Sequence, residues 1–313
     1  MMSMIQIPIV FSFDENLELP AIVCMTSLLK HAESDTYYKI YILHPKNSFK
    51  DKSRFDKLHQ CFNRFDITFI EVDTIFETAY QVRGITSPTY YRLLIPNLLD
   101  CYDKIIYSDV DVIFRSDLKQ VYSISLDEEY IAATKDLGMI LSSDGQKHMR
   151  SLGLALSEGY YQAGFILMNC RKMLEDNLVP KFINLSKSKY KYQDQDILNI
   201  VCQKKCKSLP IKYNMTDYVY RYLFQGHEYF KSMSEKDINE ALSTGTIHYN
   251  GHKPWQKYSL NFDIWWESYR NSIIYDELYY YDFFYKKVDL YDRLSLWKRM
   301  KILIRYFIFG RLK

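Results

Sequence analysis

The chain has 313 residues, of which 48% are hydrophobic and 25% are charged, so it can form one large α/β domain with an appendage or two small domains. It holds only 10 Gly and 8 Pro, which argues against long disordered linkers. The net charge of +3 is unevenly distributed along the chain. Residues 286–313 hold nine basic residues and two acids, which gives this segment a charge of +7, and the rest of the chain therefore has a charge of −4. Proteins that bind nucleic acid broadly carry basic stripes through their body instead.

The first part of the chain predicts an alternation of strands and helices. Strands are expected at Ile7–Phe11, Tyr38–Leu43 and Ile67–Val72. Helices are expected at Leu19–His31, where apolar residues recur at helical spacing, and at Ser53–Phe65. This βαβαβ order predicts an α/β fold with a mixed, mainly parallel central sheet that is flanked by helices.

Two polar turns are expected at one edge of this sheet. The turn Ser12–Asn16 follows the first strand. A helix predicted at Tyr90–Leu99 precedes the strand Ile105–Tyr107, which leads directly into Asp109-Val110-Asp111. Ligands of such sheets bind beyond the carboxyl ends of the strands, so both turns are expected in the same crevice.

The middle of the chain predicts two further strands, at Tyr130–Lys135 and Gly164–Asn169, and two helices, at Lys172–Ser186 and Asp194–Cys202. Of the six Cys, only Cys202 and Cys206 lie close in sequence, and no second pair completes a zinc site. The cysteines are therefore expected as thiols in a reducing cytosol.

The C-terminal part of the chain predicts a helical segment that binds a membrane surface. We expect a catalytic domain at residues 1–258 and a helical tail at 259–313, in which 290–309 would form a basic amphipathic helix with Lys298, Lys301 and Arg305 beside its apolar stripe. That stripe comprises Leu290, Leu294, Trp297, Met300, Ile304 and Phe307. Such a helix suits an anionic membrane surface, although packing on its own domain or on a dimer partner is the alternative.

The turn after the strand Ile105–Tyr107 carries the chemistry. An Asp-x-Asp pair alone is more often a structural turn, but His248, Gly251 and Lys253 follow in the segment HYNGHKPW. Hard divalent ions take carboxylate ligands, and an added imidazole favours Mn²⁺ over Mg²⁺. Gly allows the backbone to approach a phosphate closely, and Lys supplies a mobile positive charge. The pattern predicts a site for a divalent ion and a diphosphate.

These segments together resemble glycosyltransferase family 8, and in particular bacterial lipooligosaccharide or lipopolysaccharide α-galactosyl- and α-glucosyltransferases. The matching segments run in family order over residues 7–255, and they are Ile9–Asn16, Tyr90–Leu93, Lys104–Phe114, Ala163–Asn169, Tyr192–Asn199 and His248–Trp255. The resemblance implies the Rossmann-like GT-A fold, a UDP-hexose donor, assistance by Mn²⁺ (with Mg²⁺ as a possibility) and a saccharide or glycolipid acceptor.

The resemblance also implies how the donor is held. Asp109, Asp111 and His248 would be the metal ligands. The residues that would bind the donor, at its nucleoside, its sugar or its diphosphate, are Ser12, Asp14, Asn16, Arg92, Asp109, Ala163, Gly164, Gly251 and Lys253, so Asp109 would serve both the donor and the metal.

Three residues are implied at the reacting sugar: Asp136 at its hydroxyls, Asp194 in the pocket wall and Gln195 beside the anomeric carbon. A retaining hydrolase places a carboxylate nucleophile under the ring. Since Gln195 carries an amide, we expect the acceptor to attack on the face from which UDP leaves, which gives an α-glycoside.

The chain departs from the family pattern at Leu17, where an aromatic residue is frequent, and at two places that bear on the donor. Gln162 stands where an Asn usually precedes Ala-Gly, and Lys253 follows Gly251 after two residues instead of three. The first leaves the choice between galactose and glucose open, and the second leaves open whether the diphosphate clamp is altered.

Two rival functions compete with a retaining hexosyltransferase. Haloacid-dehalogenase-like phosphatases also have a strand followed by Asp-x-Asp, but they need a later acidic motif beside Gly, and none is evident. A catalytically inactive, membrane-associated binder of nucleotide sugars is the other, against which the intact Asp109, Asp111, His248 and Lys253 argue. We expect the protein in the cytoplasm, peripherally on the inner face of the cytoplasmic membrane, with no nucleic-acid partner and an open oligomeric state.

Overall fold

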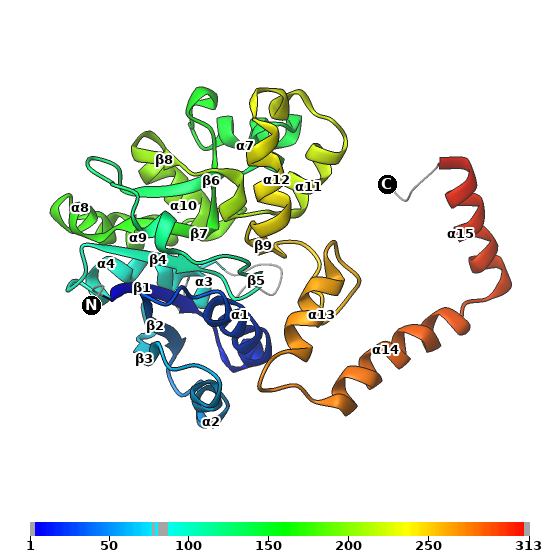
Figure 1. Ribbon diagram of the computed structural model, residues 1–313. Helices are drawn as coiled ribbons and strands as arrows, with labels where there is room; N and C mark the ends of the chain where they lie inside the picture. The colour runs from blue at the N-terminus through cyan, green and yellow to red at the C-terminus, as the bar shows by residue number, and fades with distance from the viewer. Residues whose placement is uncertain (1–3, 77–78, 81–86, 310–313) are drawn as a thin grey trace. The chain divides into compact units, whose positions relative to one another are not determined.

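The computed structural model describes residues 4–76, 79–80 and 87–309 (Figure 1). The chain divides into two compact units, Met1–Ile273 and Ile274–Lys313. Among the described residues, the strands and the segments that resemble the family all lie in the first unit, and two helices lie in the second.

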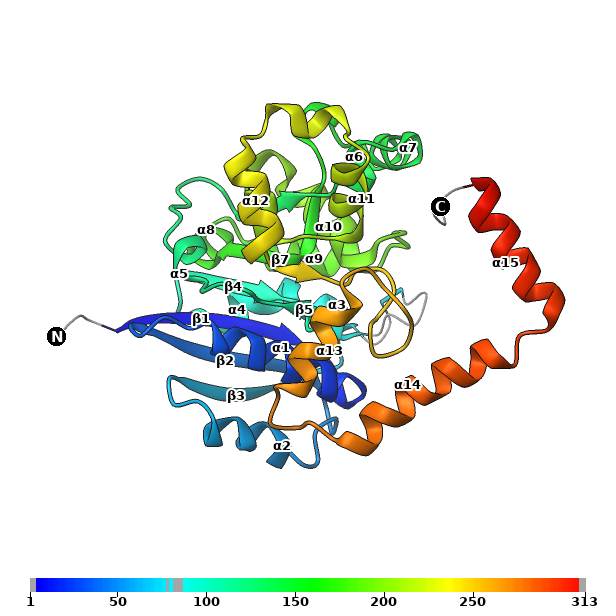
Figure 2. The same cartoon turned by 45° about the vertical axis from the view of Figure 1, so that its right-hand side comes forward.

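A seven-stranded sheet runs through the first unit in the order β3-β2-β1-β4-β7-β6-β8, and Figure 2 shows the first five of these strands side by side. β7 is antiparallel to both neighbours, and the other paired strands are parallel. The bounds are β1 Ile5–Ser12, β2 Thr36–Pro45, β3 Phe65–Val72, β4 Lys104–Ser108, β6 Ile131–Lys135, β7 Tyr161–Asn169 and β8 Cys206–Ser208. The predicted mixed, mainly parallel sheet flanked by helices is confirmed.

A second, two-stranded sheet completes the strands of the described residues. It pairs β5 (Val112–Ile113) with β9 (Ile247–His248) in antiparallel register, and Val112 lies opposite His248. This small sheet joins the segment after β4 to a segment more than a hundred residues away. The sequence analysis did not predict it, because two-residue strands show no periodicity.

The helices of the first unit surround the large sheet. Their bounds are α1 Glu18–Lys30, α2 Ser53–Asp56, α3 Pro88–Tyr91, α4 Ile95–Leu98, α5 Lys119–Tyr122, α6 Leu137–Ile140, α7 Ser143–Ser151, α8 Cys170–Glu175, α9 Leu178–Ser186, α10 Gln193–Cys202, α11 Asp217–Phe224, α12 Glu235–Thr244 and α13 Phe262–Arg270. One face of the sheet buries Ile105, Tyr107 and Ile166 with Phe182 of α9 and Ile197 of α10. Burial of such apolar side chains supplies the main drive for folding.

Two predicted helices are interrupted. The expected helix Lys172–Ser186 is split into α8 and α9 at Asn177, whose φ of 50° lies in the left-handed region that Asn tolerates better than most residues. The expected helix Tyr90–Leu99 is divided among α3, a 3₁₀ turn at Arg92–Leu94 and α4. Pro96 lies in the first turn of α4, where its missing N–H costs no hydrogen bond.

Two other helix predictions were too long. The expected helix Ser53–Phe65 ends with α2 and a 3₁₀ turn at Lys57–Gln60, because Phe65 already belongs to β3. The expected continuous helix over 290–309 is broken after α14 (Glu277–Asp292) and resumes at α15 (Leu296–Phe309). Leu290 and Leu294 therefore do not share a helix with the rest of the predicted stripe.

In the second unit, the described residues form α14 and α15. Several large apolar side chains of α15 are exposed, including Trp297, Met300 and Ile304. The side chain of Arg305 and the residues Arg311 and Lys313, which contribute to the basic charge, lie outside the described residues. Within the described residues, we find no helix with the length and apolar character needed to cross a membrane.

The sheet positions the two predicted polar turns at one edge. β1 and β4 are parallel neighbours, and their register pairs Val10 with Tyr107. Ser12 and Asp109 each stand two residues beyond this pair, so both follow their strands toward the same carboxyl edge.

Candidate active site

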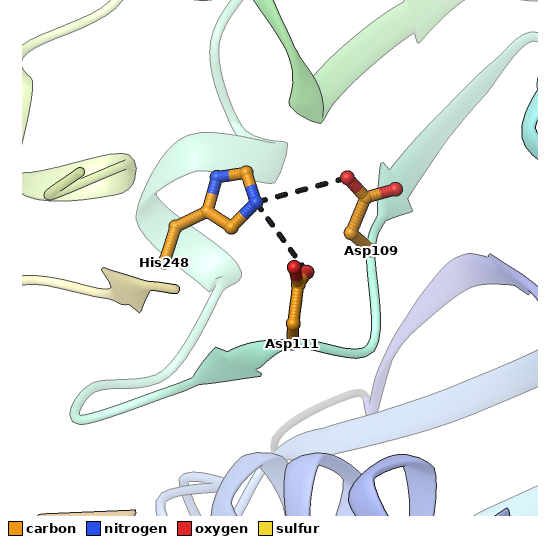
Figure 3. A group of neighbouring side chains, drawn as sticks. All are labelled: Asp109, Asp111 and His248. Atoms are coloured by element: carbon orange, nitrogen blue, oxygen red, sulfur yellow. Dashed lines mark ion pairs between the residues drawn. The ribbon is translucent and has the colours of Figure 1, made fainter. Parts of the chain in front are cut away.

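Three possible metal ligands converge beyond β4. Asp109 follows β4, Asp111 precedes β5, and His248 lies in β9, where the pairing with β5 brings it to the two acids (Figure 3). Nε2 of His248 lies 3.4 Å from Oδ1 of Asp111 and 3.7 Å from Oδ2 of Asp109. One ligand atom from each residue lies within 4.8 Å of the others.

The surroundings of these ligands fit a divalent cation. Oδ1 of Asp111 is buried and has no hydrogen-bond partner among the described residues. Gly164 keeps the site open, because a Cβ there would lie 2.2 Å from Cε1 of His248 and 2.8 Å from Oδ2 of Asp109. Two carboxylates and one imidazole are a donor set that Mn²⁺ or Mg²⁺ accepts, so an ion would satisfy the unpaired oxygen.

Asn214 fixes the orientation of His248. Its Oδ1 lies 2.8 Å from Nδ1 of His248, and both side chains are buried. An N–H on Nδ1 donates to this oxygen, and that tautomer leaves the lone pair of Nε2 directed at the two acids. The sequence analysis missed Asn214, because no motif distinguishes it within the segment YNMTD.

Lys253 forms an ion pair with Asp111 through Oδ2 and also donates to the backbone carbonyl of Tyr249 at 2.7 Å. Burial raises the pKa of Asp111, but the positive charge of Lys253, together with the neighbouring His248, outweighs this effect and holds the pKa of that carboxyl well below its usual range. Asp111 is therefore an anion at neutral pH. The predicted diphosphate clamp and a predicted metal ligand are thus neighbours.

Arg92 is a buried link between two acids. Its Nη2 lies 2.8 Å from Oδ1 of Asp109, and its Nε lies 3.1 Å from Oδ2 of Asp194. Nη1 donates to the carbonyl of Ala163 at 2.5 Å, and the guanidinium lies 4.2 Å from the ring centroid of Tyr107. Tyr107, which reads as a core residue in the sequence, donates from its hydroxyl to Oδ1 of Asp109 at 2.7 Å.

Asp194 is fully engaged. Its Oδ1 accepts from Oγ1 of Thr89 at 2.7 Å, while Oδ2 faces Arg92. Burial raises the pKa of Asp194 to about 6, against the opposing charge of Arg92. Both oxygens are thereby held in fixed directions.

A second polar cluster lies around Asp136. Its Oδ2 accepts from Nε2 of Gln162 at 2.6 Å and from Nε2 of Gln195 at 3.1 Å. Oε1 of Gln195 accepts in turn from the backbone N–H of Ala163 at 3.0 Å. Burial raises the pKa of Asp136 to about 6, although the hydrogen bond from the N–H of Met139 opposes this. Gln162, noted above as a departure from the family pattern, is therefore part of the cluster.

Helix α10, which carries Asp194 and Gln195, is fastened to its surroundings by Asp196. This fully buried carboxylate accepts from the hydroxyl of Tyr160 at 2.5 Å and from Nε2 of His148 at 2.9 Å. The carbonyl of Tyr160 accepts from the N–H of Asp136 at 2.7 Å. The network thus ties the helix to the Asp136 cluster, and the sequence analysis did not predict it.

The predicted nucleoside residues lie at the edge of the sheet after β1. Oγ of Ser12 donates to the carbonyl of Pro88 at 2.6 Å, and Oδ1 of Asp14 accepts from the N–H of Asn16 at 3.0 Å. The side chain of Asn16 is exposed. Gly251, predicted at the diphosphate, lies against Asp217, whose Oδ2 would be 2.7 Å from a Cβ at this position.

Comparison with known proteins adds independent information. The model of glycosyl transferase family 8 matches residues 8–259. The chain is 30% identical over 214 residues to a putative glycosyltransferase of Haemophilus influenzae, a match that covers 66% of this chain and 63% of that protein. It is 26% identical over 259 residues to a lipopolysaccharide 1,2-glucosyltransferase of Escherichia coli, which covers 80% of this chain and 73% of that protein.

A solved structure supports the fold. The galactosyltransferase LgtC, crystallised with donor and acceptor sugar analogues, superposes with a TM-score of 0.72 over 87% of this chain and 99% of that chain, at 23% sequence identity. The expected family and fold are both confirmed. At this level of identity the likeness concerns the fold.

The contact between Asn214 and His248 yields a test. Asn214→Ala should weaken binding of Mn²⁺ by about 10- to 100-fold, because the ring of His248 loses the partner that fixes its tautomer. Asn214→Asp keeps an acceptor oxygen at the same place and should restore most of the affinity. Titration of Mn²⁺ followed by electron paramagnetic resonance measures both, and equal affinity of a folded Asn214→Ala protein and its parent would contradict this role.

Proposed function

The chain belongs to glycosyl transferase family 8, and we propose that it is a metal-dependent retaining hexosyltransferase that uses a UDP-sugar. The observation that carries the metal dependence is the group Asp109, Asp111 and His248, with its unpaired Asp111 oxygen. A bound Mn²⁺ would act as a Lewis acid toward the negative charge that develops on the departing UDP.

The residues around the metal ligands suit a diphosphate. Lys253 already lies beside Asp111, and it can turn its ammonium group toward the phosphates. Gly251 would offer its backbone N–H at close range. We propose that these two residues clamp the diphosphate, and that Ser12, Asp14 and Asn16 hold the nucleoside at the adjoining sheet edge.

The Asp136 cluster suits the hexose. Gln162 and Gln195 fix the carboxylate, which can accept hydrogen bonds from sugar hydroxyls. Ala163 and Gly164 leave room for the ring, and Arg92 acts on the donor from its position between Asp109 and Asp194. We propose that glucose or galactose is the sugar bound here.

The arrangement of Asp194 and Gln195 favours attack on the face from which the phosphate leaves. Both oxygens of Asp194 are engaged with Thr89 and Arg92, which leaves this carboxylate poorly placed as a nucleophile. Gln195 holds an amide, and its carbonyl accepts from the N–H of Ala163. We propose that the acceptor hydroxyl attacks directly, that its proton passes to the departing phosphate, and that an α-glycoside forms.

The acceptor is proposed from the relatives. One of them is named a lipopolysaccharide 1,2-glucosyltransferase, and we propose that this chain likewise extends a surface glycan such as lipopolysaccharide or capsule. Residues 1–258 would carry out the transfer. The tail at 259–313 would attach the enzyme to the inner face of the cytoplasmic membrane through the exposed apolar residues and the Lys side chains of α15.

The first prediction from the proposed function concerns the donor and the metal. Purified protein with Mn²⁺ should release UDP slowly from either UDP-glucose or UDP-galactose, and EDTA should abolish the release. Asp111→Ala should lower the rate by at least about a hundredfold, because it removes a carboxylate ligand. Asp103→Ala, which alters an exposed acid near β4, is the matched control and should leave the rate unchanged. Release that persists in EDTA would refute the metal dependence.

The second prediction concerns Lys253. The ammonium group of Lys253 forms an ion pair with Asp111 and so competes with a metal ion for this carboxylate. Lys253→Met should therefore strengthen Mn²⁺ binding by about fivefold when no nucleotide is present. The same change should weaken binding of UDP in the presence of Mn²⁺, since it removes a positive charge from the diphosphate site. Calorimetry measures both affinities. Lys257→Met, in the same segment, should change neither, and weaker Mn²⁺ binding by Lys253→Met would contradict the ion-pair argument.

The third prediction concerns the tail. The full chain should sediment with vesicles that contain phosphatidylglycerol, less so with neutral phosphatidylcholine vesicles, and less so as salt concentration rises. Trp297→Ser combined with Lys298→Gln and Lys301→Gln should abolish sedimentation while release of UDP from the donor persists. Unchanged vesicle binding by this triple variant would overturn the role of α15.

A further inference from the structure

The first turn of helix α11 lies next to both the predicted diphosphate clamp and the Asp136 cluster. Its first residue, Asp217, contacts Gly251 on the side of the predicted diphosphate clamp. Its second residue, Tyr218, contacts Gly138 on the side of the Asp136 cluster. The sequence analysis assigned no role to either residue.

The ring of Tyr218 lies on a glycine surface. A Cβ on Gly138 would lie 2.8 Å from Cδ2 and 2.9 Å from Cε2 of Tyr218, so a side chain there would push the ring away. Gly138 stands two residues after Asp136, in α6. The side chain of Tyr218 is nevertheless 42% exposed, and its ring stacks on that of Tyr222 with centroids 6.2 Å apart and planes at 24°. An aromatic surface is thus held open next to the proposed sugar pocket.

The carboxylate of Asp217 lacks a partner. No hydrogen bond or ion pair joins it to another described residue, although it is only partly exposed. Burial raises the pKa of Asp217, and the charges of His248, His252 and Lys253 act in the opposite direction. A half-buried carboxylate that accepts no hydrogen bond from the described residues, next to the candidate active site, is suited to a ligand that carries hydroxyl groups.

The proposed reaction places the acceptor at this position. An acceptor hydroxyl that attacks on the face of the departing phosphate must lie next to both the diphosphate and the transferred sugar. The first turn of α11 borders both. An aromatic ring offers a flat apolar face to a pyranose, and a neighbouring carboxylate accepts from its hydroxyls.

We propose that Tyr218 and Asp217 form the acceptor subsite, in which Tyr218 stacks on the acceptor pyranose and Asp217 binds its hydroxyl groups. This assignment rests on the proposed transferase function.

The test uses the full chain with Mn²⁺ and the UDP-hexose that it hydrolyses. The probes are the methyl α- and β-glycosides of glucose and galactose, which should bind to the protein loaded with Mn²⁺ and UDP and accelerate UDP release from the donor. Tyr218→Ala should raise the KM of the accelerating glycoside about tenfold or more, while donor hydrolysis without glycoside and the Kd of UDP stay unchanged. Tyr218→Trp should retain the low KM.

Two further variants sharpen the result. Asp217→Asn should raise the KM of the accelerating glycoside, because an amide accepts hydrogen bonds from sugar hydroxyls less strongly than a carboxylate does. Phe224→Ala, on the same helix and 71% exposed, is the matched control and should change nothing.

Several outcomes would overturn the subsite. One is that no methyl glycoside binds or accelerates release, and another is that Tyr218→Ala leaves the glycoside KM unaltered. A third is that Tyr218→Ala lowers donor hydrolysis as much as transfer, which would mean that the ring only supports Gly138 and α6. If the parent neither releases UDP nor binds it with Mn²⁺, the proposed transferase function fails and the subsite fails with it.

Discussion

Negative charge gathered in a small volume is the constraint on which this structure depends. Asp109 and Asp111 approach one another beyond β4, and Asp194 lies on the far side of Arg92. Buried carboxylates that lack partners destabilise a fold strongly. Arg92 therefore lies between two of these acids, and Lys253 covers the third. The arrangement remains incomplete at one point, because Oδ1 of Asp111 finds no donor among the described residues.

The topology of the sheet makes this concentration of charge possible. β4 delivers Asp109 to the carboxyl edge, while the antiparallel strand β7 returns beside it and presents Gly164. The N–H of Asp109 donates to the carbonyl of Gly164 at 2.9 Å, so the two segments are fastened where they face the site. Only a residue without a side chain leaves space for His248 there. The small β5–β9 sheet then holds His248 against Asp111.

The site divides into regions with distinct chemistry. The candidate metal ligands and Lys253 form an electrostatic region that suits the proposed diphosphate. The Asp136 cluster forms a hydrogen-bonding region, in which two Gln side chains hold the carboxylate. The first turn of α11 lies against both, with an aromatic ring on one side and an unpaired carboxylate on the other. A reaction that joins two sugars would need all three environments, since the donor sugar must be held, its departing diphosphate stabilised and the acceptor sugar admitted.

Much of the fold followed from local patterns. The strands around Ile9, Ile40, Ile106 and Ile166 lie where apolar runs predicted them, because burial on both faces demands such runs. The helix predictions were less accurate near Asn177 and Pro96, where one residue changed the backbone conformation within an otherwise helical pattern. The break between α14 and α15 was likewise invisible, since apolar spacing continues across it.

The sequence by itself determined the family, the approximate positions of six strands of the large sheet and the identity of the metal-binding candidates, because strand ends and short motifs are encoded by neighbouring residues. Only the tertiary structure decided the partners. That Asn214 orients His248, that Arg92 joins Asp109 to Asp194, and that Asp217 lies against Gly251 all depend on segments that fold together from distant parts of the chain. Charge pairing and steric exclusion act through space, so no local pattern could reveal which residues would meet.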